Sequence, residues 1–418
     1  MVTLGPELGK DGAVTAEGFE RMWDELAPIG RDPRTGGYRR YAWTQADLEC
    51  RAWFGATAHE RGLDVETDGN GNLWAWWGDP AADDALVLGS HLDSVPDGGA
   101  FDGPLGVVSA FAALDLVRAR GLVPRRPLAV VAFSDEEGAR FGVACGGSRL
   151  LTGALDAGRG LALADVDGTT MAEAMSAADH DPALVGPDPE RLARIGTFVE
   201  LHVEQGLVPL DVGGETVHGL AGAGVPVGVA EAIWPHGRWR LDLRGRADHA
   251  GTTRLADRDD PMLRLAEAVL EARAAAERHH AVATVGKVRV RPNGVNAIPS
   301  QVTAWLDARG ADEARVRAVV HDVAGRVGGA ALAEESWTGL TSFDEPLRLR
   351  LARLLGDVPV LPTGAGHDAG VLAAAGVESA MLFVRNPTGV SHSPHEHADP
   401  ADCHAGVDAL AEVVTALA

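Results

Sequence analysis

Two short runs of the chain place acidic and imidazole side chains directly after stretches that resemble buried strands. His91 and Asp93 follow the apolar residues 85–89, and Glu136 and Glu137 follow a second apolar stretch. Short, nearly uncharged runs of this kind are typical of parallel strands, and open sheets usually bind ligands at their strand ends. Adjacent carboxylates in such a crevice repel each other and lose hydration, and a bound cation removes that cost. The two runs together therefore favour a catalytic metal centre, although each run alone also fits a surface loop or a solvated turn.

Three further segments carry side chains that could complete such a centre. Asp102 lies in a glycine-containing loop before a predicted helix, His202 shares one face of a predicted strand at 197–203 with Glu204, and His392 belongs to a tract with three histidines. Taken singly, these residues also fit a helix cap, an exposed strand edge and an incidental polar loop. Two neighbouring metal ions need about five protein ligands and a carboxylate that holds the hydrolytic water. The chain offers that set.

The length and composition limit the classes of function. The chain has 418 residues and a formal net charge of −23, which argues against a nucleic acid or an anionic membrane as its partner. Its three cysteines form no Cys-x-x-Cys pair, so we expect no disulfide framework and a reducing compartment. We see neither a signal peptide nor a run of the roughly 20 apolar residues that a membrane helix needs. We therefore expect a cytoplasmic protein.

The order of the predicted elements indicates two domains, as the length does. A strand at 85–89, a helix at 104–119 and a following strand make a parallel βαβ unit. From about residue 212 the pattern changes to strand, strand, helix, strand, strand, helix, which is typical of a small α+β domain. We expect an α/β fold with a mixed, mainly parallel sheet flanked by helices in residues 1–211 and 330–418. The smaller α+β domain at 212–329 would be an insertion.

The motifs resemble those of one enzyme family, and they occur in the same order along the chain. The resemblance rests on residues 89–95, 101–103, 134–141, 201–206, 248–253, 293–299, 364–369 and 391–394. They are similar to motifs of the hydantoinase/carbamoylase amidohydrolases, the allantoate amidohydrolase and N-carbamoyl-L-amino-acid hydrolase family, within the wider aminoacylase and peptidase superfamily. This resemblance implies a phosphorylase/hydrolase-like catalytic domain, an inserted lid or dimerisation domain, and a homodimer.

The resemblance also implies roles for the acidic and imidazole residues. It implies five metal ligands: His91 and His202 on one divalent ion, Glu137 and His392 on the other, and Asp102 bridging the two. Glu136 would be the general base, and Asp93 would orient His91. The family implies Zn²⁺ or Mn²⁺, and Co²⁺ or Ni²⁺ suits the same imidazole and carboxylate ligands.

Four more residues resemble the substrate-side groups of this family. Gln205, Asn296 and Arg309 would grip a substrate carboxylate, and His249 would stabilise the oxyanion, often in the active site of the partner subunit. Judged from the residues alone, Arg309 also fits a charged residue on an edge strand. Asn296 also fits a turn residue, and His249 also fits a histidine with a structural role. His367, which opens a predicted helix, would help to position the centre.

The resemblance implies cleavage of a linear ureido C–N bond in a small carboxylate, with release of ammonia and carbon dioxide. Allantoate, N-carbamoyl-L-amino acids and β-ureidopropionate all combine these two groups. We favour allantoate because residues 26–41 and the aromatic run 74–77 resemble that branch of the family. An aminoacylase or dipeptidase of the same superfamily is the alternative. A non-catalytic binding protein is disfavoured because no expected ligand is missing.

Overall fold

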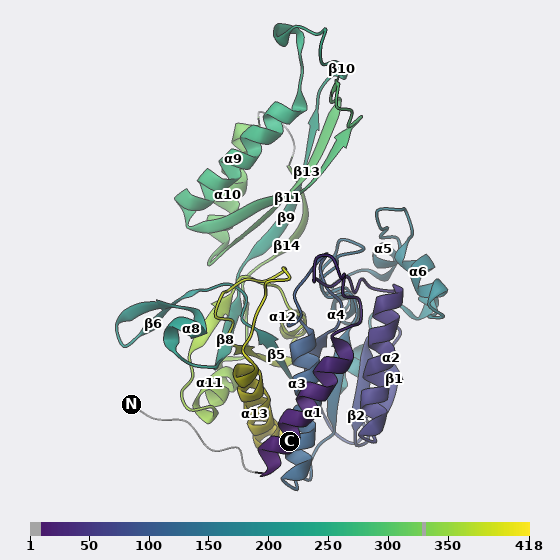
Figure 1. Ribbon diagram of the computed structural model, residues 1–418, viewed down its shortest axis with the longest axis vertical. Coiled ribbons are helices and arrows are strands. Elements are labelled where there is room, and N and C mark those ends of the chain that lie inside the picture. The colour runs from purple at the N-terminus through teal and green to yellow at the C-terminus, as the bar shows by residue number, and fades with distance from the viewer. Residues whose placement is uncertain (1–9, 328–331) are drawn as a thin grey trace. The chain divides into compact units, whose positions relative to one another are not determined.

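The computed structural model describes residues 10–327 and 332–418, and for residues 10–15 only the backbone (Figure 1). Contacts within the chain divide it into two compact units. The first unit comprises Met1–Glu231 and Ser342–Ala418, and the second comprises Ala232–Thr341. Within the described residues, no helix combines the length and the apolar character that crossing a bilayer requires.

The first unit is built on one large mixed sheet. Its strands, in the order in which they lie side by side, are β1 (Asp64–Thr67), β2 (Leu73–Trp77), β4 (Leu128–Phe133), β3 (Ala85–His91), β5 (Ile195–Val203), β17 (Glu378–Val384), β8 (Val227–Ile233) and β15 (Thr341–Ser342), with β16 (Val360–Thr363) paired to β8. The central strands β4, β3, β5 and β17 run parallel. Strands β1, β2 and β8 join them in antiparallel pairs. The α/β class with a mixed sheet is therefore confirmed, with its parallel part at the centre.

Helices cover the sheet, which is why its central strands are buried along almost their whole length. The helices of this unit are α1 (Lys10–Leu26), α2 (Gln45–Glu60), α3 (Pro104–Ala119), α4 (Gly146–Thr152), α5 (Ala157–Leu161), α6 (Met171–Ala177), α7 (Pro189–Arg194), α8 (Gly219–Ala223), α11 (Glu345–Leu354), α12 (Asp368–Ala374) and α13 (Pro400–Leu417), with a short 3₁₀ turn at Pro182–Leu184. Helices α1 and α13 pack against α3, and α3 contacts β3 and β5. Helix α3 is buried along most of its length, as expected for the crossover between β3 and β4.

The opposite face of the sheet carries a group of aromatic side chains. Phe133 contacts Trp74 and Phe198 edge to face, and the guanidinium of Arg191 in α7 lies over the Trp74 ring. Period-two alternation along β2, β4 and β5 puts these rings on one face and Leu or Val on the other. The two cores fix the sheet from both sides, so the residues at the strand ends have defined positions.

The second unit is an antiparallel sheet with helices on one face. Its sheet has the order β11 (Ala281–Arg291), β13 (Gln301–Gly310), β9 (His236–Arg244) and β14 (Leu332–Thr338), and its helices are α9 (Pro261–His279) and α10 (Glu313–Arg326). Residues of β9 and β13 alternate between buried and partly exposed, because only one face meets the helices. A separate two-residue pair, β10 (Asp248–His249) with β12 (Ala297–Ile298), and a short 3₁₀ turn at Leu255–Asp257 complete the unit.

The boundaries of the second unit differ from the expected range of 212–329. Strand β8 pairs with β17 in the large sheet, and the hairpin of β6 (Pro209–Val212) and β7 (Glu215–His218) also belongs to the first unit. Strand β14 pairs with β9 and so extends the second unit toward residue 341. The glycine-rich sequence after residue 212 forms these turns and hairpins. It therefore suggested a start of the second unit that is earlier than the observed one. The expected boundary at 329–330 lies outside the described residues.

Candidate metal centre

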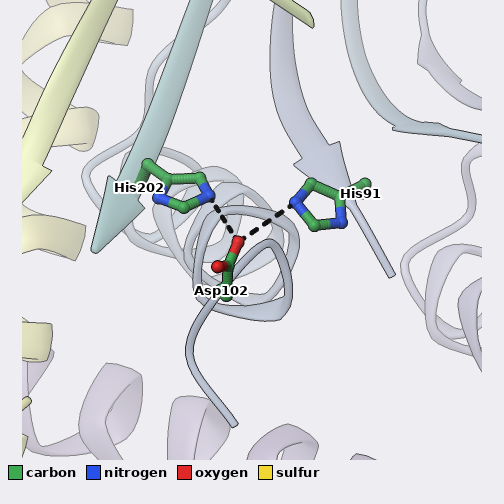
Figure 2. A group of neighbouring side chains, drawn as sticks. All are labelled: His91, Asp102 and His202. Atoms are coloured by element: carbon green, nitrogen blue, oxygen red, sulfur yellow. Dashed lines mark ion pairs between the residues drawn. The ribbon is translucent and has the colours of Figure 1, made fainter. Parts of the chain in front are cut away.

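Two histidines and one aspartate from separate segments converge in the first unit (Figure 2). His91 ends β3, His202 lies near the end of β5, and Asp102 lies in the loop before α3. The Nε2 atoms of His202 and His91 lie 3.1 and 3.5 Å from the same oxygen, Oδ1 of Asp102. Both nitrogen atoms are buried, and neither makes a hydrogen bond within the described part of the chain. Two such nitrogens beside one carboxylate oxygen form an arrangement that a cation would complete.

The second ring nitrogen of each histidine determines which atom faces the cluster. Nδ1 of His91 lies 3.1 Å from the backbone oxygen of Asp93, and Nδ1 of His202 lies 2.9 Å from that of Val203. A carbonyl oxygen can only accept a hydrogen bond, so Nδ1 carries the proton in each neutral ring. The lone pair of Nε2 is then directed at Asp102, which prepares both rings to bind a metal ion.

The loop that carries Asp102 passes so close to His91 that it needs glycine. Gly103 has a φ of +84°, and a Cβ at this position would lie 2.4 Å from Cε1 of His91. Any larger residue would displace the imidazole or the loop. The Asp102-Gly103 pair in the sequence is therefore explained by packing against His91.

A second donor set uses the other oxygen of Asp102. Nε2 of His392 lies 3.4 Å from Oδ2 of Asp102 and 3.5 Å from Oε2 of Glu137. His392 has an exposed side chain on the loop after β17, whereas Glu137 follows β4. The carboxylate of Asp102 thus presents Oδ1 to one pair of side chains and Oδ2 to another, as a ligand between two metal ions would.

Glu136 lies beside this cluster and is buried. Its Oε2 is 3.8 Å from Nε2 of His91. Burial raises the pKa of Glu136 to about 7, against the opposing effect of the His91 charge. For Asp102, burial opposes ionisation, but the contacts with His202 and His91 hold the pKa of the carboxyl well below its usual value. The environments of the two carboxyl groups therefore push their pKa values apart, with that of Asp102 lowered and that of Glu136 raised.

Asp93 follows β3, and its side chain contacts the residues that follow β4. Its carboxylate accepts hydrogen bonds from the backbone N–H groups of Glu136 at 3.1 Å and Glu137 at 3.0 Å. The family resemblance implied that Asp93 orients His91. The structure places its backbone oxygen 3.1 Å from Nδ1 of His91 and its carboxylate oxygen 3.5 Å from the same atom. The carbonyl is the closer partner, and the carboxylate mainly fixes the backbone of the glutamate pair.

Glu396 is a residue of this site that the sequence analysis did not identify. It is buried, and its Oε1 accepts hydrogen bonds from the backbone N–H groups of Phe101 at 2.8 Å and Asp102 at 2.9 Å. Its Oε2 accepts from the hydroxyl of Ser391. Glu396 lies within the histidine tract, and an acidic residue among histidines is the sequence feature that could have pointed to it. The buried acid of that tract therefore fixes the loop of Asp102.

Gln205 contacts the bridging carboxylate. Its Nε2 donates to Oδ2 of Asp102 at 2.8 Å and to Oγ of Ser391 at 2.9 Å. An ionised carboxylate can only accept, so this contact sets the orientation of the amide. The family resemblance implied that Gln205 binds a substrate carboxylate, and in the structure its amide nitrogen already holds Asp102.

A further group packs behind His202. Glu200 accepts hydrogen bonds from Ser90 Oγ at 2.7 Å and from the backbone N–H of Ala369 at 3.0 Å. The His367 ring lies against the His202 ring, with centroids 4.5 Å apart. These contacts fit the positioning role expected of His367, because they limit rotation of the His202 imidazole.

The other predicted substrate residues lie in the second unit. His249 and Asn296 are exposed neighbours at the β10 and β12 pair, where the N–H of Ala250 donates to the backbone oxygen of Asn296. Arg309 lies on β13, and its guanidinium forms hydrogen bonds with both carboxylate oxygens of Asp307. Arg309 is thus held in a defined orientation by a neighbour on its own strand.

Replacing Glu396 with Ala is expected to weaken metal binding about ten- to a hundredfold, because the N–H groups that fix Asp102 lose their acceptor. Calorimetric titration of the metal-free protein with Mn²⁺ measures this affinity, and circular dichroism checks the fold. His395→Ala is the matched control, since His395 is an exposed neighbour in the same tract. Unchanged affinity in Glu396→Ala, or a similar loss in His395→Ala, would contradict the role of Glu396.

Known proteins are similar to this chain over most of its length. Residues 87–416 match peptidase family M20/M25/M40. The chain is 35% identical to the N-carbamoyl-L-amino acid amidohydrolase of Geobacillus stearothermophilus, over 96% of this chain and 98% of that one. It is 30% identical to the allantoate amidohydrolase of Escherichia coli (strain K12), again over 96% and 98%. The crystal structure of a hydantoinase/carbamoylase family amidase from Burkholderia vietnamiensis matches with a TM-score of 0.84 at 29% identity, covering 95% of this chain and 97% of that chain.

The donor set fits the metal dependence of this family. The converging atoms are imidazole nitrogens and carboxylate oxygens without a thiolate, a combination that suits Zn, Mn, Co or Ni. The family that the sequence motifs resembled is confirmed by the match over most of the chain. The chain belongs to peptidase family M20/M25/M40, whose members are metal-dependent hydrolases.

Proposed function

We propose that the protein hydrolyses a linear ureido C–N bond in a small carboxylate substrate at a pair of divalent cations, Zn²⁺ or Mn²⁺. The observation that carries this proposal is the carboxylate of Asp102, whose two oxygens face two different donor sets. His91 and His202 would hold one ion, Glu137 and His392 the other, and Asp102 both. The names of the similar proteins, an N-carbamoyl-L-amino acid amidohydrolase and an allantoate amidohydrolase, support the substrate class.

The proton chemistry follows from the position of Glu136. Bound cations would polarise the carbonyl and make water more acidic. The buried carboxylate of Glu136 lies beside this cluster, with Oε2 3.8 Å from Nε2 of His91, and can take a proton from water there. The resulting hydroxide adds to the ureido carbon, and Glu136 returns the proton to the leaving nitrogen as the C–N bond breaks. The carbamic acid that remains decomposes to ammonia and carbon dioxide, which balances the reaction.

His249 is a suitable donor for the developing oxyanion. Its Nδ1 accepts a hydrogen bond from the backbone N–H of Gly251 at 3.0 Å. The neutral ring therefore carries its proton on Nε2, which remains available as a hydrogen-bond donor on an exposed side chain. A neutral imidazole of this kind can donate a hydrogen bond that stabilises the tetrahedral oxyanion, and it keeps its own proton.

The substrate carboxylate is proposed to bind Arg309, with Asn296 contributing hydrogen bonds. Gln205 gives its amide N–H groups to Asp102 and Ser391, so it would have to release one of these contacts to bind the same carboxylate. The Arg309 guanidinium is oriented by hydrogen bonds to Asp307 on the same strand, and a guanidinium matches the two oxygens of a carboxylate in a bidentate pair. The segments that favoured allantoate have structural tasks. Trp74 and Trp76 are buried, and Arg40 donates to backbone oxygens of the turn that precedes it. The choice among ureido acids therefore depends on comparing substrates directly.

A homodimer through the second unit is proposed from its exposed apolar surface. Leu263 and Leu270, seven residues apart on α9, are 66% and 72% exposed, and Met262 and Val269 lie beside them. Strand β11 is an edge of its sheet and exposes Val282 and Val288. An apolar helix stripe next to an open sheet edge is a surface that a second copy can cover symmetrically.

Glu136→Gln is expected to retain two bound metal ions and the wild-type thermal midpoint but to lose about 100- to 10,000-fold in kcat, because the amide cannot take a proton. Ammonia release from N-carbamoyl-L-amino acids, allantoate and β-ureidopropionate, compared with N-acetyl amino acids and dipeptides, measures both activity and class. Glu412→Gln, an exposed change on α13, is the control. Near-normal turnover in Glu136→Gln, or a preference for dipeptides, would rule out the proposal.

Arg309→Ala is expected to raise KM for an N-carbamoyl-L-amino acid at least about tenfold and KM for its carboxamide much less, because only the acid uses the charge. Arg273→Ala removes an exposed arginine from α9 of the same unit and should change neither value. Equal effects of Arg309→Ala on acid and amide would remove Arg309 from the carboxylate site.

Co-expression of Glu136→Gln with His249→Ala tests whether His249 acts across a dimer. Each variant alone should be nearly inactive. If His249 serves the partner subunit, a mixed dimer contains one complete active site. Random assembly of the two variants should then restore activity to about a quarter of that of the wild-type dimer. Size-exclusion chromatography with light scattering reports the oligomeric state. A fully active monomer, or no restoration in isolated mixed dimers, would contradict action across the interface.

A further inference from the structure

Cys145 lies beside the carboxylate of Glu136, although nothing in the sequence singled it out. Its Sγ is 3.3 Å from Oε1 of Glu136, and its backbone N–H donates to the backbone oxygen of Glu136 at 2.5 Å. The side chain is buried, and Cys145 is one of three free cysteines. A thiol that is buried next to a carboxylate remains protonated, so it acts as the donor in this contact.

The backbone of Cys145 adopts a conformation that few non-glycine residues accept. Its φ and ψ are 55° and 41°, in the left-handed region, and it immediately precedes α4. At this position a side chain commonly caps the first turn of the helix, but Cys145 makes no such hydrogen bond. Left-handed backbone at a non-glycine residue costs energy, and such residues are enriched at functional sites. Here the conformation turns Sγ away from the helix end and toward Glu136.

The two oxygens of Glu136 face different neighbours as a result. Oε1 receives the thiol, and Oε2 lies toward His91 at 3.8 Å from Nε2. The backbone of Glu136 is fixed separately, because its N–H donates to Asp93 and its carbonyl accepts from Cys145. Rotation of the carboxylate about its last bonds is the freedom that the thiol restricts.

We propose that Cys145 is a positioning residue for the general base. Its thiol holds Oε1 of Glu136, so that Oε2 faces the cluster around Asp102 where the proton is exchanged. This inference rests on the role of Glu136 in the proposed function. It adds a residue whose effect passes through a hydrogen bond to the base, and it involves no contact of Cys145 with the substrate.

Three variants of the full-length, metal-loaded enzyme test this role. Cys145→Gly keeps the left-handed backbone without strain and removes the donor, so kcat should fall about three- to tenfold while KM stays within about twofold. Its bound metal and its thermal midpoint should not decrease. Cys145→Ser restores a donor and should recover most of the lost kcat. Cys403→Ala removes another buried thiol, in α13, and should leave kcat unchanged.

The outcomes separate this inference from the proposal on which it rests. Wild-type kcat in Cys145→Gly, together with the loss of turnover in Glu136→Gln, would overturn the role of Cys145 and leave the general base in place. Equal losses in Cys145→Gly and Cys145→Ser would also overturn it, because the donor would then be irrelevant. Normal turnover in Glu136→Gln would overturn both.

Discussion

The carboxylate of Asp102 is the point on which the candidate centre depends, because each of its oxygens faces a different pair of side chains. Oδ1 faces His91 and His202, and Oδ2 faces His392, which also contacts Glu137. Glu396 fixes the backbone of Asp102, and Gln205 holds its side chain. Removing this carboxylate would leave buried imidazoles and acids without a common partner. The hydrogen bonds around it therefore bring together segments that lie far apart in the sequence.

The topology of the sheet explains how these segments meet. Strand β3 lies between β4 and β5, and the chain leaves it through α3 toward β4 before returning to β5 on the other side. The strand ends around such a reversal diverge and leave a crevice, which is where open α/β sheets bind ligands. His91, Glu136 and His202 follow or end these three strands. The Asp102 loop enters the same place because α3 starts there.

Sequence reasoning could predict the strand-end residues and the fold class, because apolar runs followed by acids are local patterns. The helix predicted at 104–119 has the bounds found in the structure. Glu396, the contact of Gln205 with Asp102 and the thiol of Cys145 depend on loops that meet only in three dimensions. The start of the second unit was expected too early for the same reason, since the pairing of β8 with β17 joins segments more than 140 residues apart. A local pattern cannot show such a partner.

Anomalous diffraction from crystals grown with Mn²⁺ would test the central claim most directly. Asp102 as a shared ligand predicts two peaks roughly 3.5–4 Å apart, one next to His91 and His202 and one next to Glu137 and His392, with both touching Asp102. A single peak, or peaks that do not touch Asp102, would contradict the account.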